Sequence, residues 1–172
     1  MKSYPTKNGR TVIIREATEK DAKAITDIVN SVASEKRYIV TEKSREDWDK
    51  AVSEIREKER GLLMVAQVNG KVVGMGHLTK GKWEKNRHVG FLGMVILKEF
   101  REIGIGTAMM DYMMRWARQE QLEKISLSVF STNKRAIRLY QKFGFELEGT
   151  IKRQYKIEGK YVDELFMRKF LT

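Results

Sequence analysis

A short glycine-containing segment is the first place in this chain where the residue types could do chemistry. It reads Arg101-Glu102-Ile103-Gly104-Ile105-Gly106 and is followed by Thr107. Glycine permits unusual backbone dihedral angles and lets a ligand approach without a Cβ in the way. The free N–H groups of such a turn, with the positive end of a helix starting near Thr107, would seat a phosphate or pyrophosphate. A plain tight turn is the alternative interpretation.

Other phosphate-binding motifs do not fit this segment. Met109 stands where a dinucleotide fingerprint needs its third small residue, and no Gly-x-x-x-x-Gly-Lys-Ser/Thr occurs in the chain. Neither a Rossmann domain nor a P-loop nucleoside triphosphatase is therefore indicated. A phosphate-bearing cofactor that is held by the backbone remains.

A second segment carries a tyrosine within an expected helix. It reads Asn133-Lys134-Arg135-Ala136-Ile137-Arg138-Leu139-Tyr140-Gln141-Lys142-Phe143-Gly144-Phe145. Ala136, Tyr140 and Phe143 share one face of the expected helix, so a core aromatic is the alternative interpretation of Tyr140.

The elements around these segments predict a mixed sheet. Leu62 to Val68 and Lys71 to Leu78 are strand-like runs joined by Asn69-Gly70, which predicts an antiparallel hairpin. Arg87 to Phe130 reads as strand, helix, strand, and hence as a parallel unit with a right-handed crossover. The other predicted helices span Ala22 to Val32, Ser44 to Lys58 and Asn133 to Phe143, and the closing strands span Phe145 to Thr150 and Tyr161 to Phe170. We expect an α/β fold in one domain, residues 1–172, with helices on both faces of the sheet.

Composition limits the function classes. The 172 residues include no cysteine, which excludes disulfides and cysteine nucleophiles, and only two histidines, His77 and His88, so we expect no metal site. The net charge of +11 attracts polyanions, which include nucleic acid and a phosphorylated cofactor. No apolar run is long enough to cross a membrane and no signal peptide is visible, so we expect a cytoplasmic protein without a membrane partner.

The two motifs together resemble the signature of the GNAT superfamily of N-acetyltransferases. The chain has Arg-x-x-Gly-x-Gly at positions 101–106 and Asn-x-x-Ala-x-x-Leu-Tyr-x-x-x-Gly-Phe at positions 133–145, in the family's order. Gly159-Lys160-Tyr161-Val162-Asp163 is similar to a segment of the branch with small-molecule and ribosomal-protein acetyltransferases. The resemblance implies the GNAT fold, a mostly antiparallel sheet of about seven strands, and acetyl-CoA as the acetyl donor.

The resemblance also implies roles for individual residues. Main-chain amides from Arg101 to Thr107 would hold the pyrophosphate of coenzyme A, and Met94-Val95-Ile96 would hydrogen-bond the pantetheine arm. Asn133 would bind the cofactor arm. Tyr140 would donate a proton to the departing thiolate, at a cost of about 2 kcal/mol with ordinary pKa values. The backbone N–H of Ile96 would meet the oxyanion.

The general base is open at this stage. Many relatives have a glutamate on the strand where this chain has Phe91. Glu35, Glu42 and His88 are candidates, and a chain of water molecules is an equal alternative. For each residue, an ordinary surface position is the competing interpretation.

The sequence does not identify the acetyl acceptor. We expect a primary amine of a small molecule, or else a protein N-terminus, bound beside the segment from Ser34 to Glu46, and direct attack on the thioester. Family members often dimerise, so a homodimer is a further expectation. The alternative functions are a basic nucleic-acid-binding module, which we do not favour, and an acyl-CoA sensor without turnover.

Overall fold

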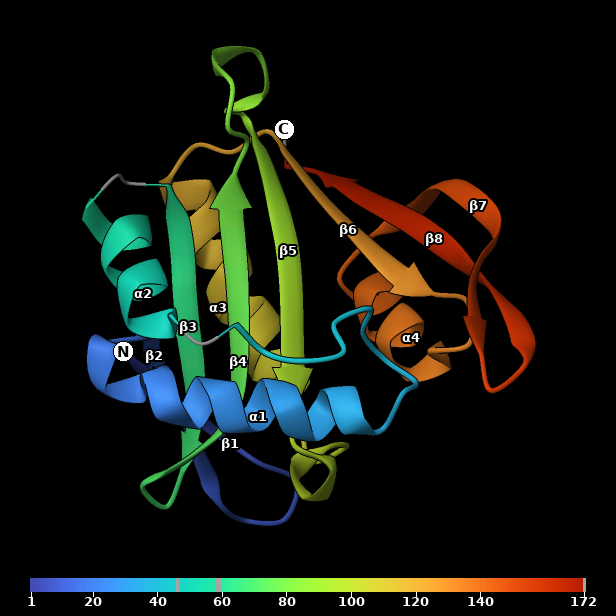
Figure 1. Ribbon diagram of the computed structural model, residues 1–172. Coiled ribbons are helices and arrows are strands. Elements are labelled where there is room, and N and C mark those ends of the chain that lie inside the picture. The colour runs from blue at the N-terminus through green and yellow to red at the C-terminus, as the bar shows by residue number, and fades with distance from the viewer. Residues whose placement is uncertain (46, 58–59, 172) are drawn as a thin grey trace.

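The computed structural model describes residues 1–45, 47–57 and 60–171 of the chain. The described strands form one sheet in the order β1-β2-β3-β4-β5-β6-β8-β7 (Figure 1). The strands are β1 (Lys2–Pro5), β2 (Thr11–Glu16), β3 (Gly61–Val68), β4 (Lys71–Lys80), β5 (Val89–Ile96), β6 (Lys124–Phe130), β7 (Glu146–Ile157) and β8 (Lys160–Phe170). The α-helices are α1 (Ala22–Ser34), α2 (Trp48–Glu57), α3 (Ile105–Gln119) and α4 (Lys134–Lys142). The predicted mixed sheet is confirmed, with eight strands instead of about seven.

Strand β1 was not predicted from the sequence, and it pairs antiparallel with β2 at the edge of the sheet. Its four residues are too few to give a recognisable alternation in the sequence. Pro5 ends the strand, and a proline, which lacks an N–H, is tolerated at an edge because no neighbour needs that donor. The edge position therefore explains how a proline-containing segment enters the sheet.

Two apolar layers bury the two faces of the sheet. Helices α1 and α2 pack on one face, where Ile25, Val29 and Val52 meet Leu63, Val65 and Met75. Helix α3 lies behind the sheet in Figure 1 and packs on the other face through Met109, Met110 and Met113, which are fully buried. Side chains alternate along a strand, so His77 lies on the same face as Met75, toward α1.

The hairpin between β3 and β4 forms as predicted. Asn69 and Gly70 both have positive φ values, 47° and 80°. These values fit the type I′ turn that two-residue hairpins favour.

The second helix is shorter than predicted. Ser44 is buried outside the helix, where its N–H donates to the Asn30 side chain at 2.8 Å and its hydroxyl accepts from Trp48 Nε1 at 2.8 Å. These contacts hold Ser44 in place before the helix begins at Trp48. The predicted end at Lys58 lies outside the described residues. At the other end of the chain, β7 is longer than expected, because pairing with β8 continues to Ile157.

β5 diverges from β6 at the centre of the sheet (Figure 1). β5 pairs with β4 from Gly90 to Ile96, but its parallel pairing with β6 ends at Phe91. The N–H of Leu97 donates to Val73 O at 2.9 Å. In an antiparallel pair such bonds recur at every second residue, so the main-chain groups of Val95 and Gly93 are turned to β4. The main-chain groups of Met94 and Ile96 are turned to the gap between β5 and β6.

We expect Asp21→Asn to destabilise the start of α1. The Asp21 carboxylate is buried, accepts from Arg15 at 2.8 Å and from the N–H of Thr18 at 2.8 Å, and forms one half of a capping box with Thr18. The hydrogen bond from Arg15 is the main cause that lowers the Asp21 pKa. The substitution should cost about 1–3 kcal/mol in the free energy of unfolding, because Arg15 loses its charged partner.

The pH dependence of stability tests this prediction. Since the Asp21 pKa is lower in the folded state, its contribution is complete above the ordinary aspartate pKa of about 3.9 and is lost as the pH falls below that value. Asp27→Asn is the control, because Asp27 makes an exposed pair with Lys23. Equal urea midpoints for the two variants at neutral pH would contradict the prediction.

Candidate active site

The glycine segment at positions 101–106 forms the N-terminal end of α3. Gly104 is the N-cap residue with φ of 99°, a left-handed value that favours glycine. The first helical bond runs from Ala108 N to Gly104 O at 3.0 Å. The N–H groups of Ile105, Gly106 and Thr107 therefore have no acceptor within the helix and can bind an anion. Gly106 is closely approached, since a Cβ there would lie 3.0 Å from Leu139 Cδ2.

Helix α4 approaches the same turn from across the gap. Asn133 is its N-cap residue, and its Oδ1 accepts from Ala136 N at 3.2 Å. The side chain thus has a structural role that the sequence analysis did not assign. Asn133 also lines the cleft between β5 and β6. Its predicted contact with the cofactor arm stays a prediction.

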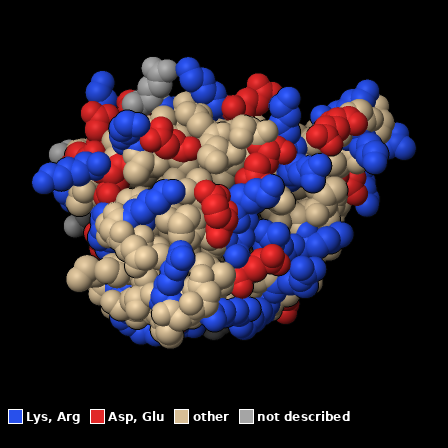
Figure 2. Space-filling view, turned by 90° about the horizontal axis from the view of Figure 1, so that it is seen from below, with Lys and Arg blue, Asp and Glu red and all other residues tan. Residues whose placement is uncertain are grey.

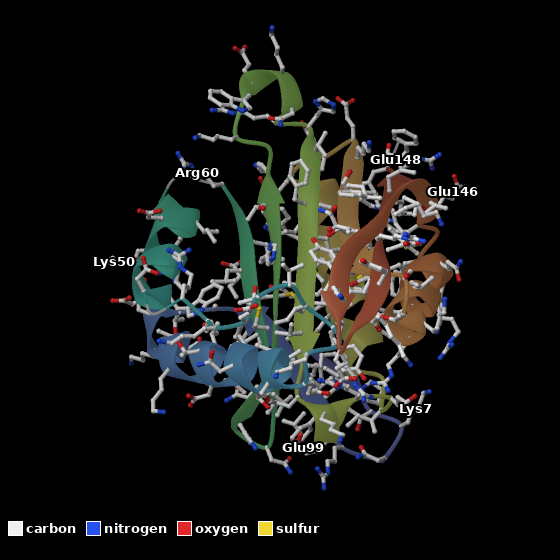
Figure 3. The ribbon with its side chains drawn as sticks, turned by 45° about the vertical axis from the view of Figure 1, so that its right-hand side comes forward. Lys7, Lys50, Arg60, Glu99, Glu146 and Glu148 are labelled. Atoms are coloured by element: carbon white, nitrogen blue, oxygen red, sulfur yellow. The ribbon has the colours of Figure 1, made fainter. Side chains whose placement is uncertain are left out.

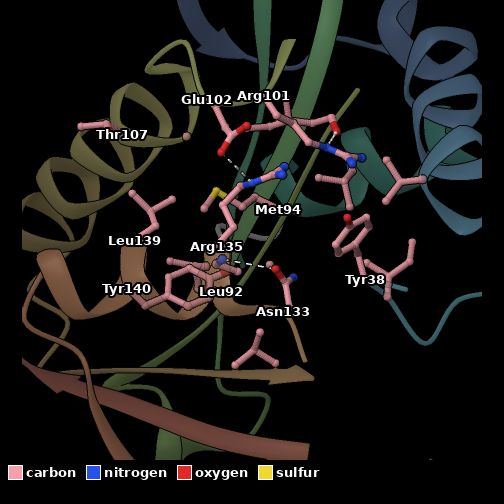
Figure 4. Close-up of a pocket in the computed structure, with 18 of the residues that line it drawn as sticks. Tyr38, Leu92, Met94, Arg101, Glu102, Thr107, Asn133, Arg135, Leu139 and Tyr140 are labelled. Carbon is pink, nitrogen blue, oxygen red and sulfur yellow. Dashed lines mark hydrogen bonds and ion pairs between the residues drawn. The ribbon is translucent and has the colours of Figure 1, made fainter. Parts of the chain in front are cut away.

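A cleft of about 330 Å³ connects these features. It is lined by the turn at Gly104 and Gly106, by Leu92 to Ile96 on β5, and by Asn133 and Tyr140 from α4 and its start. Tyr38 and Tyr140 lie on opposite sides of the cleft, with Leu92 and Met94 between them (Figure 4). The fold therefore brings together the two sequence motifs and the strand between them.

Within β5, the structure revises one predicted contact. The main-chain groups of Val95 are turned to β4, so Val95 offers the cleft its side chain and no free backbone group. Met94 and Ile96 keep the predicted orientation. The carbonyl of Ile96, however, accepts from Arg101 Nε at 2.8 Å. An arm bound along β5 would therefore find the N–H groups of Met94 and Ile96 and the carbonyl of Met94.

Tyr140 is both a core residue and a cleft residue. Its side chain is buried, and its ring centroid lies 5.9 Å from that of Phe145. Burial raises the pKa of the Tyr140 phenol to about 12. Relative to a thiol with a pKa of about 8.5, the difference of about 3.5 corresponds to about 5 kcal/mol, which corrects the sequence-based cost of about 2 kcal/mol. A thiolate formed in the same desolvated part of the cleft is also destabilised, which raises the pKa of the thiol and reduces its difference from the pKa of Tyr140.

Cationic side chains surround the mouth of the cleft. Lys7, Arg101, Arg135 and Lys142 line it, and only Glu102 is an acidic lining residue among those described. Figure 2 views this end of the molecule and shows Lys and Arg gathered along one side. Lys7 and Glu99 lie at this end of the sheet, whereas Glu146 and Glu148 lie toward the other end (Figure 3). Such a field favours a polyphosphate ligand.

Glu35, a predicted candidate base, is already engaged with Arg101. The guanidinium donates to both carboxylate oxygens, one of them at 2.8 Å, and lies 4.8 Å from the Tyr38 ring centroid. The hydrogen bonds from Arg101 are the main cause that lowers the Glu35 pKa. A general base needs a free lone pair and a pKa near the working pH. The arrangement gives Glu35 a positioning role and disfavours it as the base.

The other predicted bases lie away from the cleft. Glu42 is exposed in the segment between α1 and α2 and does not line the cleft. His88 is exposed just before β5, at the end of that strand opposite the glycine turn. Sequence reasoning missed Lys7, Tyr38 and Arg135, which reach the cleft from three separate elements. No local pattern marks them, because only the tertiary fold brings them together.

The fold and site define the class of protein. The divergent β5 and β6, the glycine turn at the start of α3 and the tyrosine on α4 form one cleft with cationic side chains at its mouth. The family model for the acetyltransferase (GNAT) family matches residues 24–145, more than half of the chain. The chain belongs to this family and is an acetyl-CoA-dependent N-acetyltransferase.

Individual relatives agree with this assignment. The chain is 32% identical over 165 residues to the L-amino acid N-acetyltransferase AaaT of Escherichia coli (strain K12), covering 92% of this chain and 97% of that protein. A GNAT-family acetyltransferase from Streptococcus pneumoniae superposes with a TM-score of 0.86 at 29% identity and covers 94% and 99% of the two chains. A ribosomal-protein-alanine N-acetyltransferase from Brucella melitensis gives 0.83 at 28% identity, covering 92% and 99%.

No α-helix among the described residues is both long and apolar enough to span a bilayer.

Proposed function

We propose that this enzyme acetylates the α-amino group of a small acceptor, in the first instance an L-amino acid, by direct attack on the thioester of acetyl-CoA. The observation that carries the proposal is the cleft through the sheet, which Tyr140 lines on one side and Tyr38 on the other. Similarity to an L-amino acid N-acetyltransferase over nearly the full length of both chains supports this acceptor class. A cytoplasmic location is part of the proposal, and so are one domain over residues 1–172 and assembly as a homodimer.

In this proposal the chain's own groups divide the reaction between them. The amides of Ile105, Gly106 and Thr107 bind the diphosphate, and the N–H and carbonyl of Met94 align the arm along β5. Acetyl-CoA supplies the activated acetyl group. The N–H of Ile96 stabilises the oxyanion. Tyr140 gives its proton to the departing sulfur, and no covalent enzyme intermediate is needed, in keeping with a chain that has no cysteine.

A protein N-terminus is the second candidate acceptor. It is favoured by the similarity to the ribosomal-protein-alanine N-acetyltransferase from Brucella melitensis. The same cleft would then receive only the first residues of the acceptor chain.

A panel of acceptors tests the proposal. The purified protein and acetyl-CoA are incubated with single L-amino acids, a polyamine, an aminoglycoside and a short peptide with N-terminal alanine, and thiol release is measured. We expect the highest kcat/KM with an L-amino acid. Turnover of the alanine peptide alone would favour the second candidate. A thermal shift with coenzyme A but no thiol release with any amine would indicate a sensor, and salt-sensitive oligonucleotide binding without that shift would indicate a nucleic-acid-binding module.

A further inference from the structure

The side of the cleft nearest α1 is formed by apolar side chains. Val32 of α1, Tyr38 and Ile39 after that helix, and Val95 of β5 all line the cleft. Val32 is only 2% exposed. Ile39 and Val95 are half-buried and pack against the apolar layer that α1 and α2 place on the sheet. Together these four residues form the apolar wall of the cleft.

Neighbouring contacts hold the apolar wall in position. The guanidinium of Arg101 lies 4.8 Å from the centroid of the Tyr38 ring and is itself held by the Glu35 carboxylate at 2.8 Å. Ile39 is held by its packing against the layer of α1 and α2. A surface that is already in place costs little conformational entropy when a ligand binds to it. The apolar wall can therefore select a ligand by shape and polarity.

Charged side chains near the apolar wall are already paired. Among the described residues, Glu102 is the one acidic side chain that lines the cleft, and it belongs to the glycine segment, where it lies 3.6 Å from Arg135. Glu35 does not line the cleft and is bound by Arg101. A charged group that loses its water against an apolar surface, without a partner, is strongly disfavoured. The apolar wall therefore suits an uncharged, apolar group.

The position of Tyr140 leaves the apolar wall to the acceptor. Tyr140 packs in the apolar core on the α3 side of the sheet, and it lies beside the departing sulfur in the proposed reaction. The amine must reach the carbonyl carbon from a side that Tyr140 does not occupy. Tyr38 lies on the side of the cleft opposite Tyr140 (Figure 4). An acceptor bound on that side has its side chain against the apolar wall.

We infer that the apolar wall binds the side chain of the acceptor, so that the enzyme selects α-amines with an apolar side chain over those with a charged or small polar one. The inference rests on the proposed function and specifies its acceptor class. Ile39 is the specificity-determining residue, because it lines the cleft from a half-buried position in which another side chain can be accommodated.

The acceptor profile of the wild-type enzyme is the first test. Thiol release is measured with L-leucine, L-methionine, L-alanine, L-serine, L-lysine and L-aspartate. We expect kcat/KM for L-leucine and L-methionine to exceed that for L-alanine by about tenfold or more, as is usual when an apolar pocket recognises additional methylene groups. L-Lysine and L-aspartate should be lower than L-leucine by about 10²-fold, because their charged ends have no partner at the apolar wall. Equal kcat/KM values for L-leucine, L-serine and L-lysine would overturn the inference.

Ile39→Asp should reverse this preference. A carboxylate at the apolar wall is expected to lower kcat/KM for L-leucine by about tenfold or more and to raise it for L-lysine. Val40→Asp is the matched control, because it adds the same charge at the next residue, which is 56% exposed and does not line the cleft. The control should keep the wild-type profile. The thermal shift with acetyl-CoA should be unchanged in both variants, since other residues hold the cofactor.

Ile39→Ala provides a second variant that adds no charge to a half-buried position. The additional space should raise the ratio of kcat/KM for L-phenylalanine to that for L-leucine by about threefold or more. Folded Ile39→Asp and Val40→Asp enzymes with the same acceptor profile, or an unchanged ratio in Ile39→Ala, would overturn the role of Ile39.

A tripeptide that begins with leucine distinguishes the two sources of an apolar α-amine. Turnover of this tripeptide in place of L-leucine, with a tripeptide that begins with lysine left unreacted, would support the apolar wall and favour a protein N-terminus as the acceptor. A wild-type enzyme that releases no thiol with any amine would instead reject the proposed function.

Discussion

Replacing Tyr140 by Phe is expected to lower kcat by about 10²- to 10⁴-fold, the range found when a general acid is removed. The substitution removes one oxygen from a side chain that is 6% exposed and lines the cleft, and it leaves the contact with Phe145 in place. The phenol has a pKa of about 12 because it is buried, so it stays protonated across the working range. It is therefore a donor and cannot serve as the base at neutral pH.

Steady-state rates and a thermal shift distinguish this role from a structural one. The thermal shift with acetyl-CoA should be unchanged in Tyr140→Phe, because the diphosphate and the arm are held by other groups. Tyr112→Phe is the matched control, since Tyr112 is a partly buried tyrosine packed against the same core but lies on α3 and does not line the cleft. If Tyr140→Phe kept the wild-type kcat at every pH, the general acid would have to be another group. An acyl-CoA sensor would be insensitive to this change.

Replacing Arg101 by Met is expected to impair acceptor binding and stability together. Arg101 links three parts of the site: its Nε donates to the carbonyl of Ile96, its guanidinium pairs with Glu35, and it stacks on Tyr38. The side chains of Arg101 and Glu35 are only 11% and 20% exposed. Loss of one partner leaves a partly buried carboxylate, so we expect about 2 kcal/mol of lost stability, less than for a fully buried pair.

The expected effect of Arg101→Met on acceptor binding follows from the positions of Glu35 and Tyr38. Glu35 directly follows α1, and Tyr38 comes three residues later. Tyr38, Ile39 and Val32 of α1 form one wall of the cleft. Release of this wall should raise KM for the acceptor by about tenfold or more, whereas kcat should change less. Glu35→Gln should have a smaller effect, because its amide oxygen can still accept from Arg101.

A neighbouring ion pair supplies the control for Arg101. Arg135 and Glu102 also line the cleft, but they are 3.6 Å apart and 44% and 70% exposed. Such a pair contributes about 0–1 kcal/mol. Arg135→Met should therefore leave stability and acceptor KM nearly unchanged, although it removes the same charge. Equal urea midpoints and equal acceptor KM values for the two variants would contradict the linking role of Arg101.

The contribution of the Arg101–Glu35 pair to stability should decrease at acidic pH. The Glu35 pKa is lower in the folded protein, so the pair contributes fully above the ordinary glutamate pKa of about 4.3. The contribution is lost as the pH falls below that value. Unfolding curves at neutral and acidic pH should therefore differ more for the wild type than for Glu35→Gln.

The sequence by itself determined the local features of this enzyme. The Asn69-Gly70 turn, the start of α3 at the glycine segment and the helix after Asn133 depend on dihedral preferences and periodicities within a few residues, which are visible in the chain. For the same reason, the two motifs correctly predicted that the glycine turn begins α3 and that Tyr140 lies on α4. The short strand β1 had no such signal, because its place depends on the edge of β2.

Only the tertiary structure decided how the site is completed. Glu35 and Arg101 are 66 residues apart in sequence, and their pairing follows from where α1 ends against the turn after β5. Which main-chain groups of β5 face the cleft depends on the register of β4 and β5, which the alternation of side chains limits but does not specify. Contacts of this kind arise from packing between distant segments, so no pattern within one segment could reveal them.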